Sequence, residues 1–250
     1  MIRNSVNLKC IMHRREFLKK LLVGLGATFI LPRIVRAVPE VQEGESVVNP
    51  HYVTHGNGFG NRIAITFDDG PSPGVTETIL KELERHDLRA TFFMIGQKVK
   101  AHPELAKAVA DAGHEIGNHS YTHPFLTRLS NDKVDDELQK TQEVIYHVTG
   151  KTPLWFRPPY GAFDKSRMGN IPLSKGLGVA YWSVDPMDWK RPGADAIVSR
   201  VLSETNPGSI VLMHDLHPQT AQAVPSLFEG IKERAFSSAN MTRFLGQPYA

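Results

Sequence analysis

The feature that most constrains the fold is a regular alternation of short apolar runs with longer amphipathic stretches. The runs RIAITF, ATFFMIG, GHEIGN, LWFR, GVAYWSV and SIVLMH lie between residues 62 and 214. A helical stretch such as residues 131–150 separates two of them, with Val134 and Leu138 on its apolar face and Gly150 at its end. Such alternation of strand and helix predicts an α/β fold with a mostly parallel sheet and right-handed crossovers.

The first 37 residues have the features of an export signal. A basic segment, RREFLKK at residues 14–20, precedes an uncharged apolar window, residues 21–31, and the small-residue sequence VRA ends at Ala37. The window is shorter than the roughly 20 residues of a membrane-spanning helix. The paired arginines resemble a twin-arginine signal, so we expect the twin-arginine machinery as a partner of the precursor and a periplasmic or extracellular location. An uncleaved anchor or a basic amphipathic helix is the alternative, and Met12 is an alternative start.

Removal of this signal would change the charge of the chain. The whole chain has 29 basic and 26 acidic residues, but residues 1–37 contain eight of the basic residues and one of the acidic ones. The remainder therefore has 21 basic and 25 acidic residues, a net charge of about −4. It carries no basic patch that would favour nucleic acid. Its lack of cysteine excludes disulfide and thiol chemistry, because Cys10 lies in the signal.

We expect two parts after the signal, a polar lead-in at residues 38–60 and one domain at residues 61–250. The last segment, FSSANMTRFLG at residues 236–246, lies where a seventh strand is expected. Its serines and asparagine make it a poor strand, which leaves closure of the sheet in doubt.

Polar side chains gather where each predicted strand ends. The groups that follow successive apolar runs are Asp68-Asp69, His119 with His123, Arg157 with PPYG, Asp185 with Asp188 and Trp189, and His214-Asp215. Active sites of parallel α/β folds lie at the carboxyl ends of the strands. We therefore expect these side chains to form one site.

The segment HSYTH, with His119 and His123, points to a metal site. The two histidines are four residues apart, so one helical turn would aim both imidazoles the same way. Two imidazoles and a carboxylate form a common metal triad with open positions. A surface histidine pair is the ordinary alternative for this motif alone, as a capped turn is for DDGP. The occurrence of all the motifs at successive strand ends favours a site.

The neighbouring aspartates need positive partners. Because successive strand residues point to opposite sides, Asp68 and Asp69 are expected to have different partners. One would face the metal with the two histidines, and the other would face Arg157 and a reacting water as a general base. His214 would supply a proton to a leaving group, and a carboxylate nearby would favour its imidazolium form.

The segments TFDDGP, HSYTH, RPPYG, DPMDW and LMH resemble, in this order, the motifs of the polysaccharide deacetylase family, which is carbohydrate esterase family four. The resemblance covers residues 62–231. It implies a distorted seven-stranded (β/α) barrel that removes N-acetyl groups from amino-sugar glycans such as chitooligosaccharides, peptidoglycan or exopolysaccharide. It also implies a divalent metal, usually zinc and sometimes cobalt or nickel.

Carried over position by position, the resemblance implies that the metal ligands are Asp69, His119 and His123. Asp68 would be the base, oriented by Arg157, and His214 would be the acid, tuned by Asp188. The residues around the substrate would be Tyr160, Trp189 and Leu212. The backbone N–H of Tyr160 would stabilise an oxyanion. Trp189 and Leu212 would wall a pocket for the acetyl methyl, or would belong to the barrel core.

Two other functions stay open. One is a related amide hydrolase that uses the same site on a small or lipid-linked substrate. The other is a glycan-binding protein that keeps the barrel without turnover. The presence of both Asp68 and His214 favours catalysis, because a binding protein needs neither a base nor an acid.

Overall fold

The structure, a computed structural model, describes residues 52–246, in which strands and helices alternate along the chain. The strands are β1 (Tyr52–Val53), β2 (Arg62–Asp68), β3 (Ala90–Met94), β4 (Glu115–Asn118), β5 (Trp155–Phe156), β6 (Gly178–Ala180), β7 (Ile210–His214) and β8 (Ser237–Ser238). The helices are α1 (Thr76–Arg85), α2 (Gly96–Ala101), α3 (Pro103–Asp111), α4 (Asn131–Thr149), α5 (Lys165–Met168), α6 (Asn170–Ser174), α7 (Ala194–Glu204), α8 (Pro218–Glu233) and α9 (Met241–Leu245).

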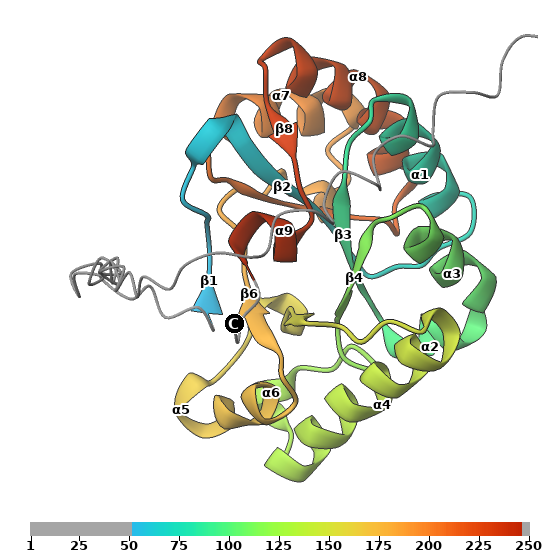
Figure 1. The fold of residues 1–250 in the computed structure, drawn as a ribbon, viewed down its shortest axis with the longest axis vertical. Helices are drawn as coiled ribbons and strands as arrows, with labels where there is room; N and C mark the ends of the chain where they lie inside the picture. The colour runs from blue at the N-terminus through green and yellow to red at the C-terminus, as the bar shows by residue number, and fades with distance from the viewer. Residues whose placement is uncertain (1–51, 247–250) are drawn as a thin grey trace, which may run out of the picture. The chain divides into compact units, whose positions relative to one another are not determined.

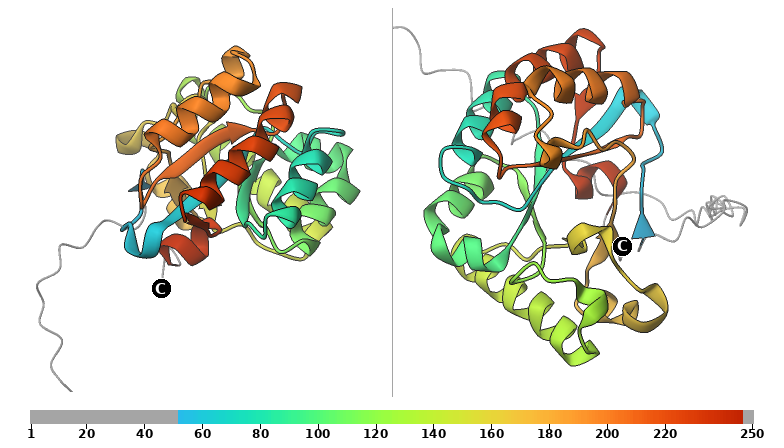
Figure 2. Two further views of the ribbon diagram at one scale, coloured as in Figure 1. Left: turned by 90° about the horizontal axis from the view of Figure 1, so that it is seen from above. Right: turned by 180° about the vertical axis from the view of Figure 1, so that it is seen from behind.

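The strands form a curled parallel sheet with most of the helices packed around its outside (Figures 1 and 2). The strand order is β1-β6-β5-β4-β3-β2-β7, and β8 pairs with β2 beside this path. Each of the six apolar runs overlaps one of the strands β2 to β7. The predicted α/β fold, a distorted barrel of parallel strands, is therefore confirmed.

The sheet begins earlier than the sequence analysis expected. Residues 38–60 were expected to be a lead-in, but Tyr52 and Val53 form β1 and pair in parallel with Val179 and Ala180 of β6. Two residues are too few to show the alternation by which a strand is recognised in a sequence.

The segment that follows β6 links this strand to β7 and so connects the two ends of the sheet. The backbone N–H groups of Ser183 and Val184 donate to the carbonyl oxygen of Ile210 at 3.0 and 3.1 Å, and Leu212 N–H donates to Val184 O at 2.9 Å. The last segment contributes little to the sheet, because β8 pairs only with Arg62 and Ile63 of β2. The expectation of a poor last strand is thus confirmed.

Strand β2 shows how the sequence directs side chains to the two sides of the barrel wall. Its alternate residues Ile63, Ile65 and Phe67 are buried in the cluster beneath the outer helices. The residues between them face the interior, and Ala64 packs there in a second cluster. Asp68 continues the interior series, so the last residue of β2 brings a carboxylate to the mouth of the barrel.

Helix α9 covers the opposite end of the barrel. Met241 and Phe244 are buried in the interior cluster, and the carboxylate of Glu115, the first residue of β4, accepts a hydrogen bond from Thr242 N–H at 2.9 Å. The amino ends of the strands are therefore covered, and the carboxyl ends remain accessible. None of the helices in residues 52–246 is long and apolar enough to cross a bilayer. The expected export signal at residues 1–37 lies outside the described residues.

Candidate active site

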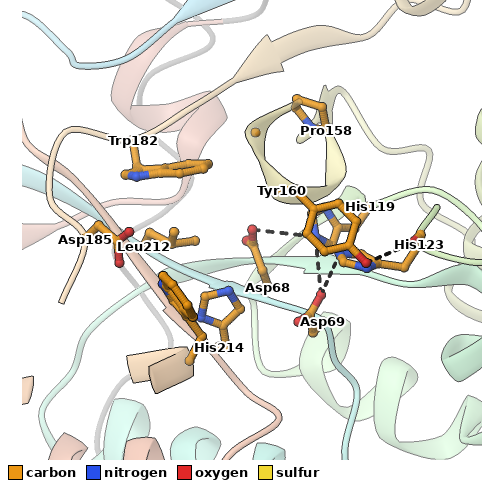
Figure 3. Close-up of a pocket in the computed structure, with 12 residues that line it drawn as sticks. Asp68, Asp69, His119, His123, Pro158, Tyr160, Trp182, Asp185, Leu212 and His214 are labelled. Atoms are coloured by element: carbon orange, nitrogen blue, oxygen red, sulfur yellow. Dashed lines mark hydrogen bonds and ion pairs between the residues drawn. The ribbon is translucent and has the colours of Figure 1, made fainter. Parts of the chain in front are cut away.

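The residues at the strand ends come together around one cavity of about 420 Å³ (Figure 3). Its lining includes Asp68, Asp69, His119, His123, Tyr160, Trp182, Asp185, Trp189, Leu212 and His214. Arg157 and Asp188, the other two residues expected at the site, lie behind this lining and are fully buried. The structure thus brings together all the residues to which the resemblance gave a role, whereas Asp215, which was also expected at the site, is buried and does not line the cavity.

Asp68 and Asp69 have different partners, as expected, because Arg157 pairs with Asp68 at 2.7 Å and His123 lies 3.2 Å from Asp69. Strand alternation is not the reason, because the two carboxylates do not point to opposite sides. Strand β2 ends at Asp68, and Asp69 has a left-handed backbone conformation with φ of 74°. Both carboxylates consequently reach His119, whose Nε2 is 3.7 Å from Asp68 Oδ2 and 3.4 Å from Asp69 Oδ1. Strand alternation does not apply once the chain has left the extended conformation.

Asp69, His119 and His123 form a group that fits a divalent metal ion. Asp69 Oδ1 lies 3.2 Å from His123 Nε2, and the three candidate ligand atoms lie within 4.8 Å of one another. Asp69 Oδ1 is buried and makes no hydrogen bond within the described residues. A carboxylate oxygen and two imidazole nitrogens are donors that zinc and related ions accept.

The hydrogen bond of His119 also suits metal binding. His119 Nδ1 lies 2.7 Å from the carbonyl oxygen of Arg157, which can only accept, so Nδ1 carries the proton. In the neutral ring, Nε2 then has a free lone pair directed at Asp69. Burial raises the pKa of Asp69, but the close contacts with His119 and His123 lower it more, so the carboxylate is ionised.

The sequence predicted a helical turn at His119 and His123, but a loop brings the two histidines together. Residues 119–123 form a loop in which Ser120 and His123 have φ of 61° and 59°. The side chain of Asn118 accepts a hydrogen bond from Ser120 N–H at 2.9 Å, and Ser120 Oγ accepts one from His123 N–H at 3.1 Å. These local hydrogen bonds fix the loop and aim both rings at Asp69.

Glu137 of α4 also holds this loop, and the sequence analysis missed it. One oxygen of its carboxylate accepts hydrogen bonds from the backbone N–H groups of Tyr121 and Thr122, each at 2.8 Å. In the sequence, Glu137 has the appearance of an ordinary charged residue on an amphipathic helix. No spacing relates it to the histidines, so no signal in the sequence could have identified it.

Arg157 holds Asp68 from inside the barrel. Its Nη1 donates to Asp68 Oδ1 and to Thr66 Oγ1, both at 2.7 Å. Its other donors reach the carbonyl oxygens of Ala180 at 3.2 Å and Tyr181 at 2.9 Å. The guanidinium is fully buried, with hydrogen bonds in several directions, so its position and that of the Asp68 carboxylate are fixed.

His214 lies across the cavity from the two histidines of the metal group, paired with Asp188 (Figure 3). Its Nδ1 is 2.7 Å from Asp188 Oδ1, and its backbone N–H and Thr220 Oγ1 both donate to Asp188 Oδ2. Burial opposes protonation, but the hydrogen bond and charge of Asp188, with further attraction from Asp68 and Asp69, raise the pKa of His214 to about 9. The imidazolium form therefore predominates at neutral pH, so His214 can donate a proton.

The remaining lining residues give the cavity an aromatic wall. Leu212 is buried, but 49% of Trp189 is exposed, so the barrel-core interpretation of Trp189 is wrong. Tyr160 is also more than half exposed, and its ring stacks on that of Phe125 with centroids 3.9 Å apart. Trp182 completes the wall. The sequence analysis missed it because it lies within an apolar run interpreted only as a strand.

Comparisons with known proteins show which family the chain resembles. A model of the polysaccharide deacetylase family matches residues 55–181. A peptidoglycan-N-acetylglucosamine deacetylase of Listeria monocytogenes is 40% identical over 186 residues, which are 74% of this chain but only 39% of the Listeria protein. A chitooligosaccharide deacetylase of Rhizobium leguminosarum bv. trifolii is 38% identical over 70% of this chain and 87% of its own length.

One solved structure with the same fold is described as a pseudoenzyme. This CE4 family pseudoenzyme of Bacillus anthracis is 36% identical, with a TM-score of 0.73 over 78% of this chain and 69% of its own. Membership of the family therefore does not by itself imply turnover. Because a family model matches half of its length, and because the Rhizobium deacetylase is 38% identical over 87% of its own length, the chain belongs to the polysaccharide deacetylase family.

Proposed function

We propose that the chain is a metal-dependent hydrolase that removes N-acetyl groups from amino-sugar glycans and releases acetate. The observation that carries the proposal is the arrangement around the cavity. The metal-binding group and the Arg157–Asp68 pair lie on one side, and the Asp188–His214 pair lies on the other. A hydrolase needs a base and an acid on either side of the bond that it breaks, whereas a binding protein does not.

The residues of the chain would share the reaction as follows. A divalent cation held by Asp69, His119 and His123 would polarise the acetyl carbonyl and favour ionisation of the attacking water. Asp68, fixed by Arg157, accepts the proton of that water as its oxygen bonds to the carbonyl carbon.

The second half of the reaction uses the other groups at the cavity. The oxyanion that develops accepts a hydrogen bond from the backbone N–H of Tyr160. His214 then donates its Nε2 proton to the amide nitrogen as the carbon–nitrogen bond breaks. The products are a free amine on the sugar and acetate, whose methyl group would lie against Leu212 and Trp189.

An amino-sugar glycan is the proposed substrate class because of the relatives and the exposed aromatic rings. The relatives are named for peptidoglycan and chitooligosaccharides. Trp189 and Tyr160 present half-exposed rings at the mouth of the cavity, on which a sugar face could stack. We propose zinc as the resident ion, with cobalt or nickel as substitutes, because the donor set accepts several divalent ions.

The test is acetate release by the purified chain from N-acetylglucosamine oligomers, peptidoglycan and poly-N-acetylglucosamine. Release that EDTA abolishes and that zinc or cobalt restores would support the proposal, and the best substrate would identify the glycan. Bound metal without release from any glycan would contradict it. A small or lipid-linked amide would then be the next substrate to assay.

A second candidate function, glycan binding without turnover, is favoured by the similarity to the pseudoenzyme. The same panel distinguishes it, because a binding protein would retain oligosaccharides in an affinity measurement while releasing no acetate.

We also propose that residues 1–37 direct export through the twin-arginine pathway, and that one domain, which includes β1, follows them. Support comes from the RREFLKK segment and the apolar window after it. Replacement of Arg14 and Arg15 by lysines should leave the protein in the cytoplasm in a fractionation experiment. Unchanged export would contradict this route.

A further inference from the structure

Asp215 is a buried carboxylate to which the proposed mechanism gives no role. It follows His214, it is fully buried, and it does not line the cavity. Its Oδ2 accepts a hydrogen bond from Thr76 Oγ1 at 2.6 Å, and its Oδ1 has no hydrogen-bond partner within residues 52–246. A buried carboxyl with one oxygen unsatisfied is costly, which calls for an explanation.

The carboxyl of Asp215 lies directly against the turn that follows Asp69. A Cβ atom added to Gly70 would lie 2.0 Å from Asp215 Oδ2 and 2.3 Å from Oδ1, so the glycine backbone packs on the carboxyl with no space between them. Gly70 does not have positive φ. The close approach of Asp215, and not the backbone conformation, therefore requires glycine here.

Asp215 also reaches the far end of this turn through Thr76. Thr76 Oγ1 donates to Asp215 Oδ2 and accepts a hydrogen bond from Ser72 N–H at 2.8 Å. In addition, the backbone N–H of Asp215 donates to the carbonyl oxygen of Asp68 at 3.1 Å. Asp215 therefore contacts the turn on both sides of Asp69.

We propose that Asp215 is a positioning residue that holds residues 69–72 and thereby directs the Asp69 carboxylate toward His119 and His123. The consequence for turnover rests on the proposed function, but the consequence for metal binding does not. Residues that orient a metal ligand from behind typically change metal affinity or activity by about 10- to 100-fold when they are replaced.

The test compares two pairs of variants with a control. Asp215→Ala and Thr76→Val remove the support, whereas Asp215→Asn and Thr76→Ser keep an oxygen that can complete the Thr76 hydrogen bond. Asparagine has the same shape as the Asp215 side chain, whose pKa burial raises to about 7, and is therefore a suitable replacement. Thr78→Val is the control, because Thr78 lies on the same helix but its hydroxyl donates to Gly74 O.

The measurements are the dissociation constant for zinc, by competition with a chelator, and the thermal unfolding of the metal-free protein. We expect Asp215→Ala and Thr76→Val to weaken zinc binding about 10- to 100-fold. Asp215→Asn, Thr76→Ser and Thr78→Val should stay within about threefold of the wild type. Wild-type zinc affinity in folded Asp215→Ala, even with a lower unfolding temperature, would overturn the proposal. If Asp215→Ala does not fold, the comparison of Thr76→Val with Thr76→Ser decides in the same way.

A double variant tests the contact itself. Gly70→Ala would push the turn away from Asp215, and Asp215→Ala in the same chain would free the space. We expect zinc to bind more tightly to the double variant than the product of the two single effects predicts. If the effects of the two substitutions on zinc affinity simply multiplied, the contact between Gly70 and Asp215 would be contradicted. Because zinc binding needs no glycan, failure of the acetate assay would remove the proposed function and leave this result intact.

Discussion

The Asp188→Asn substitution tests how the fold prepares His214 as an acid. Asp188 accepts the Nδ1–H of His214 at 2.7 Å and is itself fully buried. The pKa of His214 is raised from 6.5 to about 9, and the hydrogen bond and charge of Asp188 are the largest of the contributions that raise it. This rise corresponds to about 3 kcal/mol of preference for the imidazolium form. Asparagine keeps the shape and the acceptor but removes the charge, so burial should then hold the pKa of His214 near or below 6.5.

Because the pKa of His214 is raised, its deprotonation should affect turnover on the alkaline side. With a raised pKa, His214 is protonated at neutral pH and loses its proton as the pH rises through about 9, so turnover should fall on the alkaline side there. A bound divalent cation would cancel part of the attraction of Asp69 and move this alkaline limb of the pH profile to a somewhat lower pH. In Asp188→Asn the alkaline limb should move to a pH lower by about two units or more. At pH 8 the rate should therefore fall about 10- to 100-fold, with a smaller loss at pH 6.

The same shift has a consequence for stability. A group whose pKa is raised in the folded state stabilises the protein below its unfolded pKa of about 6.5, and this stabilisation is lost as the pH rises through about 9. Asp188→Asn should remove it, so the free energies of unfolding of wild type and variant should converge as the pH rises.

The assay is the pH dependence of kcat for acetate release between pH 5 and 10. Asp185→Asn is the control, because Asp185 lines the cavity but accepts a hydrogen bond from Met187 N–H rather than from His214. Its alkaline limb should keep the wild-type position. If Asp188→Asn also kept that position, either His214 would not be the acid or Asp188 would not set its pKa.

Two further predictions concern the supports of the site. Arg157→Gln leaves the Asp68 carboxylate buried without its charged partner, so we expect a loss of about 3–5 kcal/mol in the free energy of unfolding, measured with urea. A loss below about 1 kcal/mol would contradict the role of this ion pair. Glu137→Ala removes the acceptor for two backbone N–H groups of the histidine loop, so zinc affinity measured by chelator competition should fall about tenfold or more. An unchanged affinity would show that the loop holds its shape without Glu137.

The sequence could predict the fold because the strands are nearly continuous apolar runs. Residues such as Ile65 and Phe92 are buried beneath helices whose apolar faces repeat every three or four positions. Elements without such a pattern could not be predicted. The two residues of β1 are too few, and the pairing of Val184 with Val211, which joins the ring, depends on contacts between distant parts of the chain.

The candidate site could be selected from the sequence, but its geometry could not. Polar residues after buried strands identify the rim, because parallel strands end at one edge of a sheet. The left-handed conformations of Asp69 and His123 leave no mark in the residue pattern, since neither is a glycine. Glu137 holds the histidine loop through hydrogen bonds to a distant segment, which neither spacing nor periodicity records. The sequence places Asp215 after a strand, but its contact with Thr76 depends on the fold.

The most direct test of the proposed mechanism compares Asp68→Asn with Asp69→Asn. Metal content per chain and acetate release from the best glycan would be measured on the same preparations. The proposed roles predict that Asp68→Asn keeps wild-type metal content but loses at least about 99% of acetate release, because only the base is removed. Asp69→Asn should lose metal and acetate release together. Wild-type acetate release by Asp68→Asn, or a loss of metal equal to that of Asp69→Asn, would contradict the division of the two aspartates into a base and a ligand.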